Sequence, residues 1–264
     1  MTPSIGKTLM VALLLCAACS VVVSFTAVSL RPLQEANALI ERKRSVLQAA
    51  GRFSDGADIE AEFSRFEVRV VDLESGEFID DYPGDPLKLD ARKLARDAET
   101  SIALPSGGDP ALLRRRENLT SVYLLRDDAG ALESLVLPVR GYGLWGTLYG
   151  YIALSGDLER VDGLVFYEHK ETPGLGGEVD NPSWRAKWRG KTLRGADGDL
   201  LIEVIKGQVD ADAPEAIYQV DGLAGATLTS RGVTNMVRFW LGETGFGALL
   251  VRLGQGAQRE EGAS

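Results

Sequence analysis

The chain has 264 residues, of which 45% are hydrophobic and 25% charged, an ordinary globular composition with room for one large or two small domains. Its net charge of −9 argues against a nucleic-acid binder, because such proteins gain affinity by neutralising phosphates with Lys and Arg. Both cysteines, Cys16 and Cys19, lie in an N-terminal apolar run, which excludes a disulfide scaffold, a Cys-ligated metal or a cysteine nucleophile in the rest of the chain. The single histidine, His169, argues against a multi-His metal site or a Ser-His-Asp triad, so no metal is expected. Any redox chemistry would therefore come from a bound organic cofactor.

The N-terminal run over residues 8–30 carries no charged side chain and is long enough to cross a bilayer as a helix. A signal peptide is the alternative, but the run exceeds the usual apolar region of one and no small-x-small cleavage site stands out beyond it. The stretch from Cys16 to Cys19 mimics a lipoprotein cleavage box, except that Cys16 stands where an aliphatic residue is wanted. We therefore predict a retained transmembrane helix within residues 1–32.

The basic residues on either side of this run bear on its orientation. Lys7 and the amino terminus lie on one side, and Arg31, Arg42, Lys43 and Arg44 lie on the other. Taken alone, the positive-inside rule would place the part of the chain after the span in the cytoplasm.

After the span, we expect a helical juxtamembrane stem (33–60), a domain (61–254) and a polar tail (255–264). Hydrophobic periodicity predicts the domain's elements. Strands are predicted at 66–73, 122–126, 132–139, 164–167, 200–206 and 217–220, and helices at 87–98, 184–189 and 231–241. The run Arg114-Arg115-Arg116 is interpreted as a solvated face.

Residues 141–154 interleave four glycines with four aromatic residues. This pattern predicts a bent hairpin whose backbone lets a flat group approach closely. Packing of the aromatic rings across paired strands is the alternative.

Residues 168–178 contain Pro173-Gly174 followed by Gly176-Gly177, a pattern that favours a tight loop with exposed backbone. His169 in this loop is interpreted as a surface or hydrogen-bonded residue rather than a catalyst.

The stretch from Asp221 to Ser230 is built almost wholly from small residues and runs into an amphipathic helix. Apolar residues at 233, 236, 237, 240 and 241 form the stripe of that helix, and Ser230 is predicted to be its N-cap. Small-residue backbone before a helix N-terminus favours a phosphate, because unpaired N–H groups and the positive dipole end meet there. A small-residue turn that only packs a core helix is the alternative.

Asp221-Gly222-Leu223-Ala224-Gly225-Ala226-Thr227 resembles the flavinylation motif of proteins that carry FMN on a threonine through a phosphoester bond. In that motif an Asp comes first and a Gly-Ala pair precedes the acceptor. The resemblance therefore implies FMN on Thr227, with Asp221, Gly225 and Ala226 in the matching positions. Ala224 stands where the family often has Ser or Thr, and Thr229 is the local rival for the attachment.

The loop from Glu171 to Gly176 and the stretch 141–150 are similar to those of the C subunit of the Na+-translocating NADH:quinone reductase (Nqr). The match also includes the N-terminal span, the segment 184–188 and the flavinylation motif, and so covers most of the chain. The related G subunit of Rnf-type ion-translocating complexes shares the loop and the motif and is the runner-up. Residues 142–145 look closer to the reductase protein.

This resemblance implies a single N-terminal transmembrane helix followed by an α+β FMN-binding domain with mostly antiparallel strands. The FMN-binding region would span about residues 130–245. It also implies an electron-carrying subunit of a six-subunit complex that passes electrons from NADH to ubiquinone and exports sodium, with no complete activity from this chain alone. Members of the family cross the bacterial inner membrane once and hold their flavin domain in the periplasm. A flavin transferase would attach the FMN.

The flavin itself would do the redox chemistry, and loop residues would position it. Candidate cofactor-binding residues are Glu171, Thr172, Leu175, Gly176 and Trp145. Leu175 and Gly176 are the candidates for covering the flavin ring, together with Trp145, and Lys206 is a candidate for the phosphate. A membrane-tethered flavin-binding or scaffold module is the alternative from another functional class. A free-standing flavoenzyme is disfavoured, because no general acid/base pair is evident near the motif.

Overall fold

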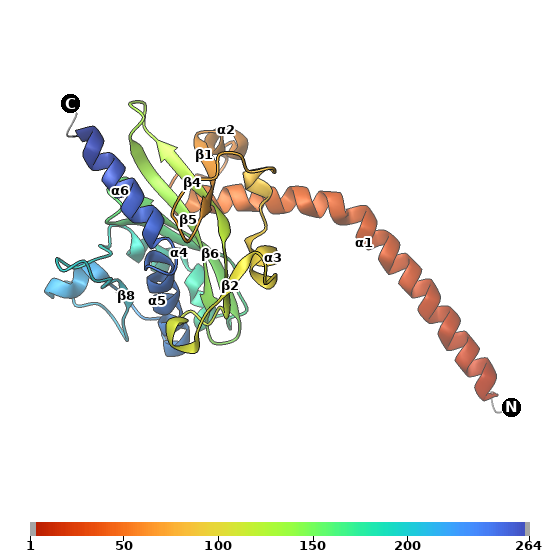
Figure 1. Ribbon diagram of the computed structural model, residues 1–264. Helices are drawn as coiled ribbons and strands as arrows, with labels where there is room; N and C mark the ends of the chain where they lie inside the picture. The colour runs from red at the N-terminus through yellow and green to blue at the C-terminus, as the bar shows by residue number, and fades with distance from the viewer. Residues whose placement is uncertain (1–3, 262–264) are drawn as a thin grey trace. The chain divides into compact units, whose positions relative to one another are not determined.

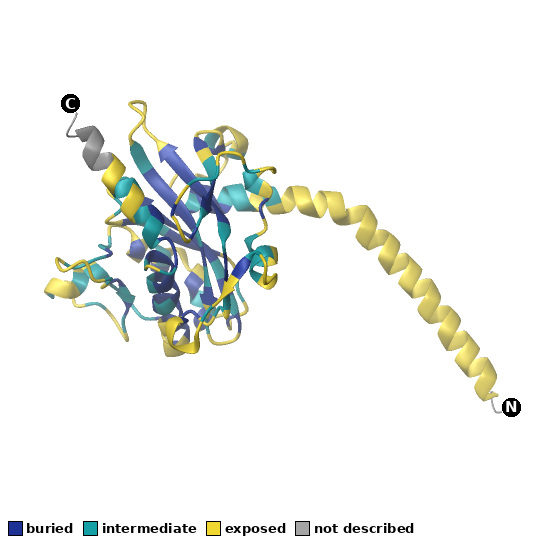
Figure 2. Cartoon of the chain, in the orientation of Figure 1, coloured by how far each residue is buried: buried dark blue, intermediate teal, exposed yellow. Residues whose placement is uncertain are grey.

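The computed structural model describes residues 4–261 of the chain (Figure 1). The chain divides into two compact units, Met1–Arg42 and Lys43–Ser264. Helix α1 (Ile5–Ala49) is one continuous helix of 45 residues, and its N-terminal part is exposed along its whole length (Figure 2). By length and composition, α1 is able to cross a membrane.

The second unit begins inside α1 rather than at residue 61. Ser45, Val46, Leu47 and Ala49, in the last turns of α1, are all buried. Part of the stretch predicted as a stem, residues 33–60, therefore belongs to the core of the domain, and the apolar N-terminal segment continues into that part as one helix.

A five-stranded antiparallel sheet forms the centre of the domain (Figure 1). Its strands follow in the order β1-β4-β5-β6-β7, so most neighbours in space are also neighbours in the chain. Their bounds are Phe66–Asp72 for β1, Leu119–Arg126 for β4, Leu132–Tyr142 for β5, Thr147–Ser155 for β6 and Val161–Glu168 for β7.

Both faces of the sheet are covered, because successive side chains of a strand point to opposite faces. In β4, Val122 and Leu124 belong to one core cluster, and Tyr123 and Leu125 belong to the other. The first cluster includes helix α5 (Thr227–Leu241), and the second includes the end of α1 together with α2 (Ile59–Phe63). The strands are accordingly among the most buried parts of the chain (Figure 2).

Short elements and a second long helix complete the domain. The two-stranded pairs are β2-β3, which is antiparallel, and β8-β9, which is parallel. The bounds are Pro86–Lys88 (η1), Ala91–Arg96 (α3), Ser101–Ala103 (β2), Ser106–Gly108 (η2), Arg115–Glu117 (β3), Gly176–Asp180 (η3), Pro182–Arg185 (α4), Ala186–Trp188 (η4), Glu203–Val204 (β8), Pro214–Tyr218 (η5), Gln219–Val220 (β9) and Gly247–Glu261 (α6).

Several predicted elements differ from the observed ones in extent. The strands at 200–206 and 217–220 shrink to the two-residue strands β8 and β9. The helix at 87–98 splits into η1 and α3, because the carboxylate of Asp90 accepts the N–H of Lys93 and starts a new helix. Residues 255–261, predicted as a polar tail, continue α6.

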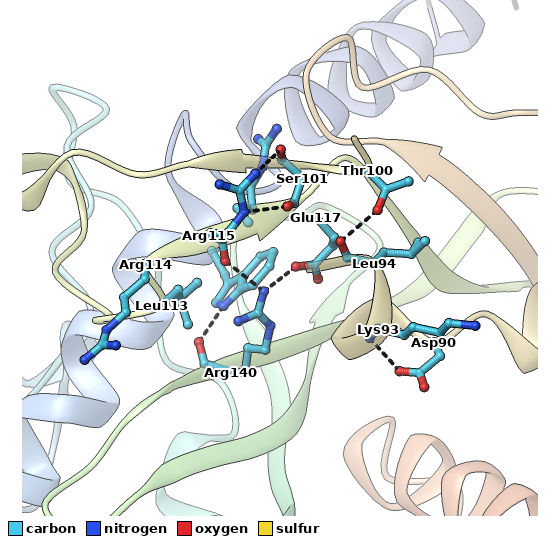
Figure 3. Close-up of polar contacts among 12 residues, drawn as sticks. Asp90, Lys93, Leu94, Thr100, Ser101, Leu113, Arg114, Arg115, Glu117 and Arg140 are labelled. Atoms are coloured by element: carbon cyan, nitrogen blue, oxygen red, sulfur yellow. Dashed lines mark hydrogen bonds and ion pairs between the residues drawn. The ribbon is translucent and has the colours of Figure 1, made fainter. Parts of the chain in front are cut away.

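The arginine run at 114–116 is not a solvated face, because only Arg114 is exposed. Arg115 donates to the carbonyl of Ser101 (Figure 3), and Arg116 is 3% exposed and donates to the carbonyl of Thr244 over 2.6 Å. In β3, Arg116 and its neighbour Glu117 are both buried. The buried Arg116 connects β3 to the segment between α5 and α6.

Next to this run, Glu117 forms a buried ion pair with Arg140 of β5 (Figure 3). The carbonyl of Arg140 in turn accepts the indole N–H of Trp240 in α5 over 2.7 Å. Removing one partner would leave a buried charge unpaired, which costs about 3–5 kcal/mol.

The glycines of the 141–154 hairpin make room for the protein itself rather than for an external flat group. A Cβ on Gly141 would lie 2.6 Å from Cβ of Met236, and one on Gly143 would lie 2.5 Å from Oε1 of Glu171. A Cβ on Gly150 would lie against the backbone of Val165. The expectation of an open backbone is therefore wrong at these positions.

The aromatic rings of the hairpin pack across paired strands, as the alternative interpretation has it. Tyr151 and Tyr149 of β6 lie next to Tyr167 of β7, with ring centroids 5.3 and 6.3 Å from it. Tyr142 and Trp145 are the exceptions, since they are 40% and 64% exposed.

Helix α5 can approach the hairpin this closely because position 232 has no side chain. A Cβ on Gly232 would lie against the carbonyl oxygen of Tyr142 and 3.1 Å from Cα of Gly143. We predict that Gly232→Ala lowers the free energy of unfolding by about 1–3 kcal/mol, the usual cost of overpacking a core. Equilibrium denaturation of the full chain in detergent measures it.

Gly254 of α6 is the matched control, because nothing lies within 4 Å of a Cβ placed there. Gly254→Ala should be neutral or stabilising by up to about 1 kcal/mol, since alanine favours a helix interior. Equal losses of stability in the two variants would contradict the close-approach account.

Candidate functional site

Thr227 is the first residue of α5, and its side chain is exposed. The chain reaches it from β9 through a turn in which the N–H of Ala226 donates to the carbonyl of Leu223 and Gly225 adopts a φ of 71°. Ala226 occupies the N-cap position, and no side chain caps the helix. The first-turn N–H groups of α5 therefore lie beside an exposed hydroxyl, an arrangement suited to a phosphate.

Helix α5 begins four residues earlier than predicted, so Ser230 is not its N-cap. Ser230 lies in the first turn, where its N–H donates to the carbonyl of Ala226. Its hydroxyl accepts the N–H of Leu223 over 3.0 Å. Ser230 thus fixes the turn that leads into the helix from inside the fold.

The two threonine hydroxyls of this turn face different surroundings. Thr229 is fully buried, and its Oγ1 donates to Oε2 of Glu171 over 2.6 Å. Thr227 is exposed at the surface. Of the two hydroxyls, that of Thr227 is the accessible one.

Glu171, predicted as a cofactor contact, is 5% exposed and hydrogen-bonded within the protein. Besides accepting from Thr229, its Oε1 accepts the backbone N–H groups of Leu144 and Trp145 over 3.0 and 2.9 Å. The carboxylate thereby joins the hairpin turn, its own loop and the first turn of α5.

His169 orients this loop and is hydrogen-bonded, as the sequence interpretation has it. Its Nε2 lies 2.7 Å from Oδ2 of Asp180, and its Nδ1 accepts the N–H of Glu171 over 3.2 Å.

The loop at 172–177 folds back tightly on the carbonyl of Thr172, which accepts the N–H groups of Leu175 and Gly177. Leu175 is 44% exposed, and its Cδ2 would lie 2.9 Å from a Cβ placed on Gly225. The structure therefore brings the loop and the Asp221–Thr227 motif side by side. Gly176 is buried, and a Cβ there would lie 2.6 Å from both Glu171 Oε2 and Thr229 Oγ1.

Asp221 anchors the start of the motif. Its Oδ1 accepts the N–H of Val209 over 2.9 Å, its Oδ2 forms an ion pair with Lys187, and its carbonyl accepts the indole N–H of Trp184 over 2.8 Å. Burial alone would raise the pKa of the Asp221 carboxyl, but the hydrogen bonds from Lys187 and Val209 outweigh it and lower that pKa below its ordinary value.

A cavity of about 460 Å³ opens beside Thr227, between α5 and the segment 203–207. Lys206, Arg231 and Arg238 line it, and Arg238 is paired with Glu203 over 3.3 Å. Arg231 was not a predicted site residue, although it stands four positions after Thr227 and so shares its face of a helix. That spacing becomes informative only when α5 is known to start at Thr227.

Exposed apolar side chains occur at the start of α5 and on the hairpin turn. Leu228 follows Thr227 directly and is exposed, as are Leu144 and Trp145 of the hairpin turn. In the described part of the chain, no group of three or more His, Cys, Asp or Glu residues could hold a metal ion.

Comparison with known families identifies the class of this site. The family model of the FMN-binding domain matches residues 143–242, which include the hairpin turn, the loop at 172–177 and the motif up to Thr227. The site therefore lies in an FMN-binding domain.

Comparison with whole proteins is more specific. The C subunit of the Na+-translocating NADH-quinone reductase from Pseudomonas aeruginosa is 53% identical over 257 residues, covering 96% of this chain and 97% of that protein. The corresponding protein from Yersinia pestis is 44% identical over 258 residues, covering 96% and 95%. The crystal structure of NqrC from Shewanella oneidensis superposes with a TM-score of 0.76 at 35% identity, covering 83% of this chain and 98% of that one.

The chain belongs to the NqrC family, the C subunits of the Na+-translocating NADH-quinone reductase, which is an oxidoreductase complex. This confirms the resemblance seen in the sequence and favours the reductase protein over its Rnf counterpart. The predicted fold class, an N-terminal apolar helix followed by an α+β domain with an antiparallel sheet, is also confirmed.

The lowered pKa of Asp221 gives a test of its anchoring role. A carboxyl group with a depressed pKa in the folded state stabilises the fold above its unfolded-state pKa, and this contribution is lost as the pH falls through the folded-state pKa. We expect Asp221→Asn to cost about 1.5–3 kcal/mol at neutral pH, typical of hydrogen bonds to charged groups. The difference from wild type should shrink towards zero below pH 3.8, the ordinary pKa of the group.

Denaturant unfolding across that pH range measures the difference. Asp197→Asn serves as the control at an exposed loop position and should change stability by less than about 0.5 kcal/mol. A cost for Asp221→Asn that does not change with pH would contradict the charge-based account.

Proposed function

We propose that this chain is an electron-carrying subunit of the Na+-translocating NADH:ubiquinone reductase and holds FMN covalently as a phosphoester on Thr227. The observation that carries the proposal is the exposed hydroxyl of Thr227 at an uncapped helix N-terminus, within a motif of the flavinylated type. The buried, hydrogen-bonded state of Thr229 supports Thr227 as the acceptor over its rival.

The residues around Thr227 suit the phosphate end of the cofactor. In forming the ester, the Thr227 oxygen bonds to phosphorus, its hydroxyl proton is released, and the group that activates the phosphate leaves the flavin nucleotide donor. A flavin transferase would catalyse this exchange. The product keeps a negative charge, which the first-turn N–H groups of α5 would stabilise together with Lys206 and Arg231 of the adjoining cavity.

The ring end of the cofactor requires an apolar surface with nearby backbone donors. Leu175 offers such a surface beside Gly225, and Trp145 and Thr172 offer exposed groups on the neighbouring turns. Glu171 and Gly176 are buried behind them, so we assign these two residues to support of the site rather than to direct contact.

FMN, when bound, supplies one- and two-electron redox chemistry, which the side chains of this domain lack. The chain itself holds the cofactor permanently at a fixed place in the complex. That place lies on the path by which electrons pass from NADH to ubiquinone. Sodium export is a property of the whole complex in this proposal. A scaffold role without flavin is the competing function, and in-gel fluorescence distinguishes the two, because only a covalent flavin survives denaturation.

We predict that Thr227→Ala abolishes the flavin fluorescence of the denatured protein band while the protein still reaches the membrane. The reason is that no other threonine hydroxyl of the motif is accessible. The chain is to be produced together with its flavin transferase and examined in a denaturing gel under ultraviolet light.

Thr229→Ser is the matched control, because serine keeps the hydroxyl that donates to Glu171. It should retain the fluorescence. Flavin that persists in Thr227→Ala would contradict the assignment of the acceptor.

We further propose that α1 spans the bacterial inner membrane once and that the flavin domain lies in the periplasm, as the family resemblance implies. The basic residues Arg42, Lys43 and Arg44, which oppose this orientation in a simple count, lie well beyond the apolar run; Lys43 and Arg44 already belong to the compact domain.

Alkaline phosphatase fused to the C-terminus tests this topology, because that enzyme is active only outside the cytoplasm. We expect an active fusion, and an inactive β-galactosidase fusion at the same position. The reverse pair of results would place the domain in the cytoplasm.

A further inference from the structure

The carboxylate of Glu171 is buried next to the proposed attachment site and accepts hydrogen bonds only. Its three donors are the N–H groups of Leu144 and Trp145 and the hydroxyl of Thr229. All three donors are neutral. Each points a hydrogen at an oxygen of Glu171, which is the pattern of an ionised carboxylate.

Two other buried or half-buried acidic groups of this domain have cationic partners. Asp221 is paired with Lys187, and Glu117 is paired with Arg140. Among residues 4–261, by contrast, no Lys or Arg forms an ion pair with Glu171. Within this described part of the chain, the charge of Glu171 is therefore stabilised by three neutral hydrogen-bond donors and has no ion-pair partner.

The position of this charge is set by close packing. Gly176 lies directly against Glu171 Oε2 and Thr229 Oγ1, so the loop at 172–177 runs over the carboxylate. Thr229, its hydrogen-bond partner, is two residues from Thr227 in the first turn of α5. Leu175, next to Gly176, faces the motif at Gly225. The charge thus lies immediately behind the surface that would receive the flavin.

We infer that Glu171 is a positioning residue that also lowers the reduction potential of the flavin, acting through the protein rather than by contact. This inference rests on the proposed function. A reduced flavin carries more negative charge than an oxidised one, so a fixed negative charge behind it disfavours reduction. Because the carboxylate is buried, water and salt screen this effect much less than they screen a surface charge. The same three hydrogen bonds fix the positions of the hairpin turn, the loop at 172–177 and α5 relative to one another.

The test is a redox titration, with mediators, of the full flavin-bearing chain in detergent. Glu171→Gln removes the charge and keeps the shape, since the amide oxygen still accepts from Leu144 and Trp145 and the amide N–H donates to Thr229. We expect covalent flavin at the wild-type level and a midpoint potential more positive than that of wild type, with the shift preserved at high salt. A potential equal to or below that of wild type overturns the inference.

Thr229→Val separates the charge from the packing. It is isosteric and removes one donor, so the carboxylate keeps its charge with less compensation, and the midpoint potential should be no higher than that of wild type. If Glu171 had only a structural role, the midpoint potentials of both variants would shift in the same direction. A rise of the midpoint potential in Thr229→Val comparable to that in Glu171→Gln therefore also overturns the inference. This second variant decides alone if Glu171→Gln does not fold.

Glu178→Gln is the matched control on the same loop. Glu178 is partly exposed and accepts from the side chain of Asn181 over 2.7 Å. The midpoint potential of Glu178→Gln should shift less than that of Glu171→Gln, and the shift should disappear at high salt. A wild-type chain without covalent flavin would overturn the proposed function itself, which is a different result from a flavin whose potential ignores Glu171.

Discussion

A buried carboxylate must find hydrogen-bond donors, and Glu171 finds them in parts of the chain that are far apart in sequence. Two come from the turn between β5 and β6, and the third comes from Thr229 at the start of α5. Glu171 itself lies in the loop after β7. Its hydrogen bonds therefore fix this loop, the hairpin turn and α5 relative to one another. The surface that carries Thr227 is the outer side of that junction.

The close approach of these elements depends on residues without side chains. Gly143 and Gly176 leave room for the Glu171 carboxylate, and Gly232 lets α5 lie against the backbone of the hairpin. The same arrangement decides which threonine hydroxyl is accessible. Thr229 is buried and hydrogen-bonded to Glu171, whereas Thr227 is exposed. The covalent chemistry proposed for this domain therefore follows from how its interior is packed.

Much of the fold could be predicted from the sequence, because β4 and β5 are buried on both faces and therefore contain continuous apolar runs, such as that at residues 122–125. The elements that depend on tertiary contacts could not be predicted in this way. Ser230 has the composition of an N-cap, yet its hydroxyl accepts the N–H of Leu223 within a turn that only the folded chain forms. Arg116 belongs to a run that local pattern assigns to solvent, and the carbonyl that binds it comes from Thr244, more than a hundred residues on.

The motif around Thr227 can be recognised in the sequence, because the flavinylation motif that it resembles has particular residues at particular spacings. The supporting residues behind it carry no such signal: Glu171 is one carboxylate among many until its partners are known.

The central claim is that the hydroxyl of Thr227, and no other group of the motif, carries the cofactor. Trypsin should release residues 207–231 as one peptide, because no Lys or Arg lies between Lys206 and Arg231. Tandem mass spectrometry of this peptide from the wild-type chain tests the claim most directly, since it contains both Thr227 and Thr229. The account predicts that the fragments place the added FMN phosphoester on Thr227. A peptide without added mass, or fragments that place it on Thr229, would contradict the account.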